Sequence, residues 1–261
     1  MNNDTPVYVL GTGLSHNGSA VLLKNGKVAF AIEKERITRK KHEGGNDNAA
    51  IEYCLRAEGI RLEEVSVVVQ TANFEIPERE QYKGYRILAD FPEVPLHSIS
   101  HHLAHAYSTI GTCPYDAFNI MVLDGCGSPF RQCMDIQDLS KVMGHMGGPG
   151  MTCEKDSFYY YDGDRLYTVF KDFSGMASFE GNQHFQLPTT RHSIGGFYAA
   201  ISQYCFGNMD DAGKLMGLAA FGKKPVVDKD PFTWVDDCLL VNDEWKVSLQ
   251  SPAENYTRFT A

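Results

Sequence analysis

Short runs of apolar residues alternate with turn residues at the start of the chain. The runs PVYVLG, SAVLLK and KVAFAIE lie between residues 6 and 33, and the pair Asn25-Gly26 separates the second run from the third. An Asn-Gly pair favours a tight hairpin because both of its residues tolerate a positive φ angle. The pattern therefore predicts three antiparallel strands in succession.

A helical spacing of apolar residues follows this strand-rich region. Ile51, Cys54 and Leu55 recur at intervals of three and four, with Asp47 before them as an N-cap and Gly59 after them as a stop. Side chains at these intervals share one face of a helix. The sequence therefore predicts an amphipathic helix, and the apolar run VSVVVQ after it predicts a strand.

Similar signals continue along the rest of the chain. HHLAHAYSTI predicts a helix, AFNIMVLDG predicts a buried strand that ends in a turn, and SFYYYDGDRLYTVFKDF predicts a hairpin around an Asp-Gly pair. Residues 144–150 (GHMGGPG) are expected to form a surface loop because they are rich in glycine. SIGGFYAAISQYCFG predicts a helix that opens a second lobe.

A strand meander followed by alternating helices and strands indicates an α/β fold. This order predicts an RNase H-like lobe, the building block of the actin-like ATPase superfold. We expect the first lobe to span residues 1–175 and the second to span residues 176–261. So few residues follow the opening helix of the second lobe that we expect this lobe to be truncated here or completed by another chain.

The charge balance and the cysteines narrow the functional classes. A net charge of -9 disfavours generic nucleic-acid binding, which depends on clustered lysine and arginine. Seven cysteines are spread along the chain without a CxxC pair, which indicates reduced thiols rather than a thiolate zinc site. No stretch has the pattern of a signal peptide or of a membrane span. We therefore expect a soluble, cytoplasmic protein with neither a nucleic-acid nor a membrane partner.

Three histidines within five residues form the sharpest chemical signal. On a helix, His101 and His105 lie one turn apart and can present both imidazoles to a single cation, whereas His102 points elsewhere. Such a pair is a common metal-ligand arrangement, and a polar helix face is the alternative. Asp124 ends an apolar strand just before Gly-Cys-Gly, where its carboxylate could add a third ligand. Two histidines, a carboxylate and an open position suit zinc or ferrous iron.

Three further segments are candidates for contact with phosphate. In ERITRKKH, Arg39 and Lys41 could form charge-assisted bonds to phosphate oxygens, and a solvated face is the alternative. TGLSHNGSA is either a phosphate-cradling hairpin loop or an ordinary polar turn, since it lacks a complete glycine motif. GKLMGLAAFG predicts a tight helix with a glycine cap, for which packing is the first explanation.

In this order, HNGSA, EKERITRKKH, HHLAHA, VLDGCG and GKLMGLAAFG resemble the motifs of the NodU/CmcH family of O-carbamoyltransferases. The resemblance extends from about residue 6 to residue 222. It implies an N-terminal actin-like domain that is similar to the tRNA threonylcarbamoyl transferase. It also implies a C-terminal domain, in cis or in trans, that activates carbamoyl phosphate.

The resemblance implies a chemistry for the metal site. His101 and His105 would be ligands of Fe(II) or Zn, and Asp124 would be a third ligand or a neighbour of the reaction intermediate. Asp124 or His16 would act as the catalytic base. Where relatives usually carry His-Asp-Ser-Ala, this chain has His16, Asn17, Gly18 and Ser19, so the identity of the acceptor is open.

The resemblance also implies contacts with ATP or carbamoyladenylate. Lys41 would contact the nucleotide or its acyl phosphate, and the loop from Gly125 to Gly127 would hold the adenylate phosphate. The full set of expected cofactor-binding residues is Arg39, Lys41, Gly125, Gly127, Lys214 and Gly217.

The reaction implied by the family is the transfer of a carbamoyl group to a hydroxyl of a small-molecule natural product. Carbamoyl phosphate and ATP would yield carbamoyladenylate, which would be the immediate donor. Two alternatives stay open: an enzyme like the tRNA threonylcarbamoyl transferase, or a non-catalytic remnant that binds nucleotide. The acidic charge of the chain disfavours the first of these.

Overall fold

The computed structural model describes residues 5–14, 17–71, 86–136, 142–144, 152–175, 194–223, 230–235 and 238–241. Contacts within the chain group it into two compact units. The first unit comprises residues 1–104 and 132–134, and the second comprises residues 105–131 and 135–261. Each unit has a β-sheet of its own.

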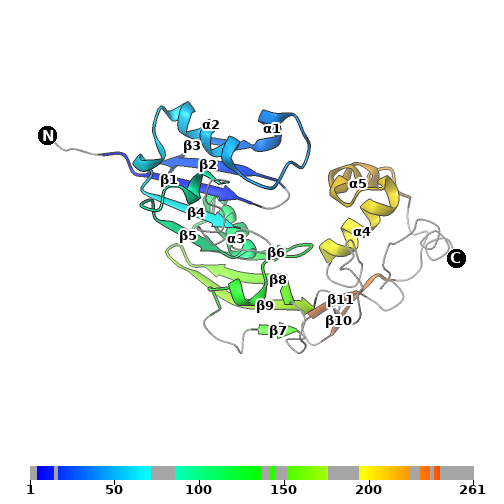
Figure 1. Ribbon diagram of the computed structural model, residues 1–261. Helices are drawn as coiled ribbons and strands as arrows, with labels where there is room; N and C mark the ends of the chain where they lie inside the picture. The colour runs from blue at the N-terminus through cyan, green and yellow to red at the C-terminus, as the bar shows by residue number, and fades with distance from the viewer. Residues whose placement is uncertain are drawn as a thin grey trace. The chain divides into compact units, whose positions relative to one another are not determined.

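The first unit is built on a five-stranded sheet (Figure 1). Its strands are β1 (Tyr8–Gly13), β2 (Ser19–Lys24), β3 (Lys27–Glu33), β4 (Val67–Thr71) and β5 (Leu96–Ile99), and they lie in the order β3-β2-β1-β4-β5. β2 is antiparallel to β1 and β3, whereas β4 and β5 run parallel to β1. A sheet in this order with only the second strand reversed is that of an RNase H-like lobe, so this prediction is confirmed.

Local sequence sets the first tight turn and the C-terminal end of α2 (Asn48–Glu58) as expected, whereas the side chain of Asp47, at the N-cap position of α2, makes no capping hydrogen bond. Asn25 and Gly26 have φ angles of 51° and 77°, which fit the tight turn between β2 and β3. Helix α1 (Lys34–Thr38) follows β3 directly. Helix α2 ends at Gly59, whose φ of 76° gives the left-handed cap that glycine adopts without strain.

The core of the first unit lies between its sheet and α2. Leu10 and Leu22, on β1 and β2, are fully buried, because alternate residues of each strand face the same way. Ile51 and Cys54 of α2 are also fully buried, and α2 packs on β2 and β3 (Figure 1). Burial of one such aliphatic side chain contributes about 1.5 to 3 kcal/mol, so the predicted helical face is what anchors α2.

The second unit contains a four-stranded sheet. Its strands are β6 (Phe118–Leu123), β7 (Val142–Gly144), β8 (Thr152–Tyr161) and β9 (Leu166–Gly175), in the order β6-β8-β9-β7. β6, β8 and β9 form an antiparallel meander like that of β1, β2 and β3. The two units divide the chain after residue 104, whereas the expected lobes divide it after residue 175, and that expected division stays a prediction. Because β6 pairs with β8, these two strands lie in a sheet separate from that of β1 to β5.

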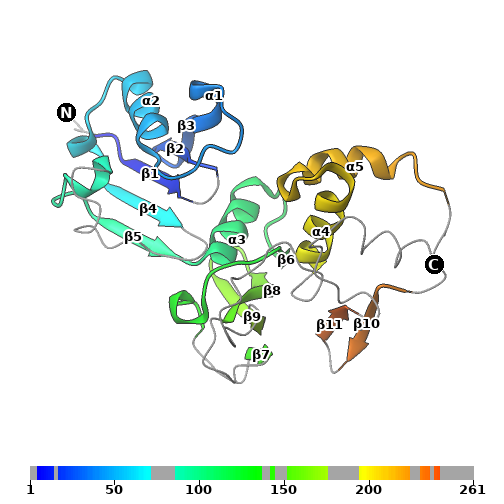
Figure 2. The same cartoon turned by 45° about the vertical axis from the view of Figure 1, so that its right-hand side comes forward.

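The helices and remaining strands complete the described chain. Helix α3 (His101–Thr112) runs from the end of the first unit into the second, and α4 (Ile194–Phe206) packs against α5 (Ala212–Ala219), as Figure 2 shows. β10 (Phe232–Val235) and β11 (Cys238–Val241) form a small hairpin. Short 3-10 helices span Leu62–Glu64, Ile87–Ala89, Phe130–Gln132 and Met209–Asp211. Within the described ranges, every helix is too short or too polar to cross a bilayer.

Most of the predicted elements are present. The helices expected from HHLAHAYSTI and SIGGFYAAISQYCFG are α3 and α4, and the hairpin expected around Asp162 and Gly163 is formed by β8 and β9. Of the loop expected at residues 144–150, all but Gly144 lie outside the described residues. Strand β5 was not predicted, since its proline-flanked sequence has the signals of a loop. The α/β fold class is confirmed.

Candidate functional site

The two histidines predicted as metal ligands lie one turn apart on α3. One ring nitrogen of His101 lies within 4.8 Å of one ring nitrogen of His105. His105 is exposed and His101 is partly buried, whereas His102 between them is fully buried. His102 therefore lies on a different face of α3 from His101 and His105, as predicted, and it is packed in the interior.

Asp124 provides a carboxylate beside His105 within the second unit. It follows β6 directly, and one of its carboxylate oxygens lies within 4.8 Å of a ring nitrogen of His105. The Gly125 N–H donates to Oδ1 of Asp124 at 2.6 Å, so the side chain is held in a defined orientation. Imidazole nitrogens and a carboxylate oxygen at this separation suit zinc or ferrous iron. The residues present therefore fit the predicted metal.

The loop after Asp124 is paired with β8. Here the loop of residues 125–128 is called the glycine loop. The Gly127 N–H donates to the carbonyl of Glu154 at 2.9 Å, and the Gly125 N–H is already bonded to Asp124. Both amides expected to hold an adenylate phosphate are thus engaged within the protein.

Helix α4 begins against the same loop. A Cβ atom on Gly195 would lie 2.3 Å from the Gly125 nitrogen and 2.4 Å from the carbonyl carbon of Asp124. No side chain fits there, because carbon atoms do not approach backbone atoms so closely. Glycine at position 195 therefore permits the first turn of α4 to touch the candidate metal site, a role that the sequence pattern did not reveal.

Cys126, in the middle of the glycine loop, does not supply a thiolate. Its side chain is buried beside Cys153. The hydrogen bond with Cys153, together with burial, raises the pKa of the Cys126 thiol far above its usual value. The thiol is therefore protonated at neutral pH and is a poor metal ligand or nucleophile.

In the first unit, the early loop and the basic segment lie together. The Gly18 N–H donates to the Glu43 carbonyl at 3.2 Å, and the Gly18 carbonyl accepts the Lys34 N–H at 2.7 Å. The side chains of Asn17 and His42 lie 3.2 Å apart, between Oδ1 and Nδ1. A Cβ atom on Gly18 would lie 2.8 Å from the Asn46 carbonyl oxygen, so glycine permits this close approach.

The cations of the basic segment differ sharply in burial. Arg39 and Lys41 are exposed, and the backbone turns at Arg39, whose φ is 64°. Lys34 is buried and donates from Nζ to the Gly44 carbonyl at 2.9 Å. Sequence reasoning missed Lys34 because a lysine at a strand end looks like a surface residue. His16 lies outside the described residues.

The last two predicted cofactor residues lie on α5 in the second unit. Lys214 is exposed and forms an ion pair with Asp211 at 2.7 Å. A Cβ atom on Gly217 would meet no atom within 4 Å, so packing among the described residues does not require glycine there. Lys214 is thus paired within its own segment, and the expected contact of these two residues with a cofactor stays a prediction.

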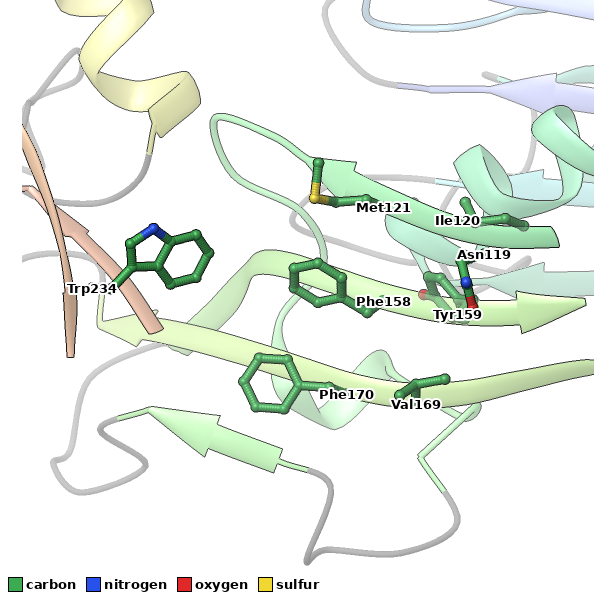
Figure 3. Close-up of a pocket in the computed structure, with 8 residues that line it drawn as sticks. All are labelled: Asn119, Ile120, Met121, Phe158, Tyr159, Val169, Phe170 and Trp234. Atoms are coloured by element: carbon green, nitrogen blue, oxygen red, sulfur yellow. The ribbon is translucent and has the colours of Figure 1, made fainter. Parts of the chain in front are cut away.

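The second sheet carries an apolar pocket of about 520 Å³, shown in Figure 3. Met121, Phe158, Phe170 and Val169 form much of its lining, and the ring of Trp234 faces Phe158 and Phe170. Asn119 contributes one of the few polar groups. This lining offers little to a phosphate or a metal, so the candidate chemistry lies at Asp124 and not in this pocket.

Comparisons with known proteins find similarity to a family in the first part of the chain. Residues 9–85 match the carbamoyltransferase N-terminus family. The nodulation protein NolNO of Sinorhizobium fredii is 27% identical over 134 residues, which cover 43% of this chain and 20% of that protein. An uncharacterized Synechocystis protein, sll1178, is 24% identical over 262 residues, which cover 85% of this chain and 36% of that protein. The chain thus spans a minor part of the length of these relatives.

The chain also has a weak likeness to solved structures. YeaZ from Pseudomonas aeruginosa superposes with a TM-score of 0.36 and 9% sequence identity, over 68% of this chain and 72% of that protein. Because this likeness is weak, the assignment of the fold rests on the order and direction of the strands.

Proposed function

Because residues 9–85 match the carbamoyltransferase N-terminus family, we propose that the chain takes part in O-carbamoyl transfer to a small molecule. The observation that supports the chemistry is the approach of Asp124 to His105, one helical turn from His101. These three side chains would hold one Fe(II) or Zn ion. The proposed donor is carbamoyladenylate, made from carbamoyl phosphate and ATP, and the proposed acceptor is a hydroxyl of a natural product.

In the proposed reaction, the acceptor oxygen forms a bond to the carbamoyl carbon. The bond between that carbon and the adenylate phosphate oxygen breaks, AMP leaves with its electron pair, and the acceptor proton passes to a base. Zinc or ferrous iron, when bound, would supply Lewis-acid polarisation of the carbamoyl carbonyl. His101, His105 and Asp124 position that ion, and a nearby carboxylate or imidazole takes the proton.

Metal binding tests the first part of this proposal. We expect the metal-stripped chain to bind one equivalent of Zn²⁺, or of Fe²⁺ without oxygen, as measured by calorimetry and elemental analysis. His101→Ala and His105→Ala should each abolish stoichiometric binding, because each removes a nitrogen ligand. The matched control is His97→Ala, which removes an exposed histidine of β5. If all three variants bind the metal ion equally, the proposed metal site is refuted.

Transfer tests the second part. The chain is supplied with carbamoyladenylate and a panel of polyhydroxylated acceptors, and AMP and carbamoylated product are measured by mass spectrometry. We expect product with the metal-loaded chain and none with His105→Ala. We also propose that a carbamoyl phosphate-activating domain, in cis or in trans, supplies the donor, so its addition should make transfer depend on ATP and carbamoyl phosphate. Product formation that survives His105→Ala unchanged would contradict the proposed role of the metal.

A further inference from the structure

The glycine loop rests on a buried network of charges. Glu154 of β8 accepts the Ser128 N–H through Oε2 at 2.9 Å and the Lys171 ammonium through Oε1 at 2.5 Å. Lys171 also contacts Oδ2 of Asp135 at 2.8 Å. Glu154, Lys171 and Ser128 are fully buried. A carboxylate therefore links the end of the loop to a cation in the interior of the second unit.

The main chain of Glu154 holds the same loop from the other direction. Its N–H donates to the Ser128 carbonyl at 2.9 Å, and its carbonyl accepts the Gly127 N–H at 2.9 Å. These two backbone bonds would persist with another side chain at position 154. What the carboxylate adds is a bond to the Ser128 N–H, which fixes the direction of the peptide between Gly127 and Ser128.

A contribution to folding stability does not explain why the charges of this network are buried. Removal of charges from water carries a large desolvation penalty, and replacement of a buried ion group by apolar residues of similar volume is often neutral or stabilising. The network does provide a directional acceptor of fixed position. Directional hydrogen bonds are what orient metal ligands, because they restrict the rotation of each ligand.

A chain of bonds leads from this acceptor to the candidate metal ligand. Glu154 fixes Ser128 and Gly127, and the loop between them and Asp124 is only two residues long. The Gly125 N–H in that short loop donates to Oδ1 of Asp124 at 2.6 Å. The orientation of the Asp124 carboxylate thus depends on the path of the glycine loop.

We propose that Glu154 is a positioning residue, whose carboxylate is held by Lys171 and holds the glycine loop so that Asp124 faces the metal. This inference rests on the proposed metal site. It assigns a function in metal binding to a residue outside the proposed ligand set of His101, His105 and Asp124. It also explains why a fully buried charge lies on a strand beside the site.

The test compares Glu154→Leu, which removes the acceptor, with Glu154→Gln, which keeps an acceptor oxygen and loses the charge. Glu52→Gln is the control, because Glu52 is an exposed glutamate on α2. The probe is Co²⁺, titrated into the full chain and followed by its visible absorption. Hydrogen exchange measures the protection of the Ser128 amide.

For Glu154→Leu we expect a Co²⁺ affinity about 10- to 100-fold lower than that of the wild type, the range for the loss of a group that orients a ligand. The absorption band should change shape, and the Ser128 amide should exchange at least about tenfold faster. Glu154→Gln should lie between Glu154→Leu and the wild type, and Glu52→Gln should match the wild type. Since Glu154→Leu can fail to fold, Glu154→Gln alone decides the matter if it does.

A wild-type affinity and spectrum in the folded Glu154 variants would overturn the positioning role, even if their stability has changed. A wild-type chain that binds no Co²⁺ would instead overturn the proposed metal site, and the positioning role with it. The two failures are therefore distinct. Slow Ser128 exchange in Glu154→Leu would show that the backbone bonds suffice to hold the loop, which also contradicts the proposal.

Discussion

Asp156 offers a sharp test of the electrostatics of the second unit. It lies on β8 with 4% of its surface exposed, and its Oδ2 is 3.4 Å from Nζ of Lys155. Lys155 makes a shorter contact, at 2.6 Å, with Asp172. Among the described residues, Oδ1 of Asp156 has no hydrogen-bond partner. Burial therefore raises the pKa of Asp156 from 3.8 to about 6, although Lys155 opposes the shift.

This raised pKa makes the stability of the second unit depend on pH. The folded state binds the proton of Asp156 more tightly than the unfolded state, so the stabilisation is complete below pH 3.8 and is lost as the pH rises through about 6. From these two pKa values, the free energy of unfolding should fall by about 1.4 kcal/mol between pH 5 and pH 8. Asp156→Asn removes the titrating group, so this loss should be absent from the variant.

The measurement is urea unfolding of the wild type and of Asp156→Asn at pH 5 and at pH 8. We expect the free energy of unfolding of the variant, relative to that of the wild type, to rise by about 1.4 kcal/mol from the lower to the higher pH. This double difference cancels all groups that titrate equally in both proteins. Parallel pH profiles for the two proteins would refute the reasoning, because they would show that Asp156 is ionised across the whole range.

Two further predictions concern packing. Two guanidinium nitrogens of Arg86 bind the fully buried carboxylate of Asp47. Arg86→Met leaves this carboxylate without its cation, so it should lower the free energy of unfolding by about 3 to 5 kcal/mol in urea titrations. A loss below about 1 kcal/mol would mean that Asp47 reaches water in the variant. Gly195→Ala should cost about 1 to 3 kcal/mol or more, since its Cβ would overlap the backbone at Gly125. The control is Gly213→Ala on α5, where the added Cβ meets open space, so this change should leave stability unchanged or raise it. Equal melting temperatures for the two alanine variants would show that α4 does not touch the glycine loop.

Local signals in the sequence were sufficient for much of the fold. The turn at Asn25 and Gly26 and the end of α2 at Gly59 were predicted from residues that tolerate positive φ. The relation of His101 to His105 followed from the pitch of a helix alone. Each of these features depends on neighbours within about four positions, so no knowledge of the rest of the chain was needed.

Local signals did not predict which strands distant in the sequence would pair. The pattern predicted the strand before Asp124 but not its partner, and the structure pairs β6 with β8 in a sheet separate from that of β1 to β5. The pattern of β6 fits either sheet, because a half-buried strand shows the same alternation whichever partner it has. The approach of Asp124 to His105 was accordingly a hypothesis from resemblance and spacing, and the tertiary structure supplied the distance.

The sequence by itself determined the local elements, the histidine pair and the motifs that resemble those of a known family. Only the tertiary structure decided which charges are buried. Lys34 and Glu154 look like surface residues in the sequence, yet both are interior groups that hold loops beside the candidate sites, while Arg39 and Lys41 are exposed. The physical reason is that the cost of burying a charge is offset by hydrogen bonds from residues far along the chain, and a sequence pattern does not show which distant groups will meet.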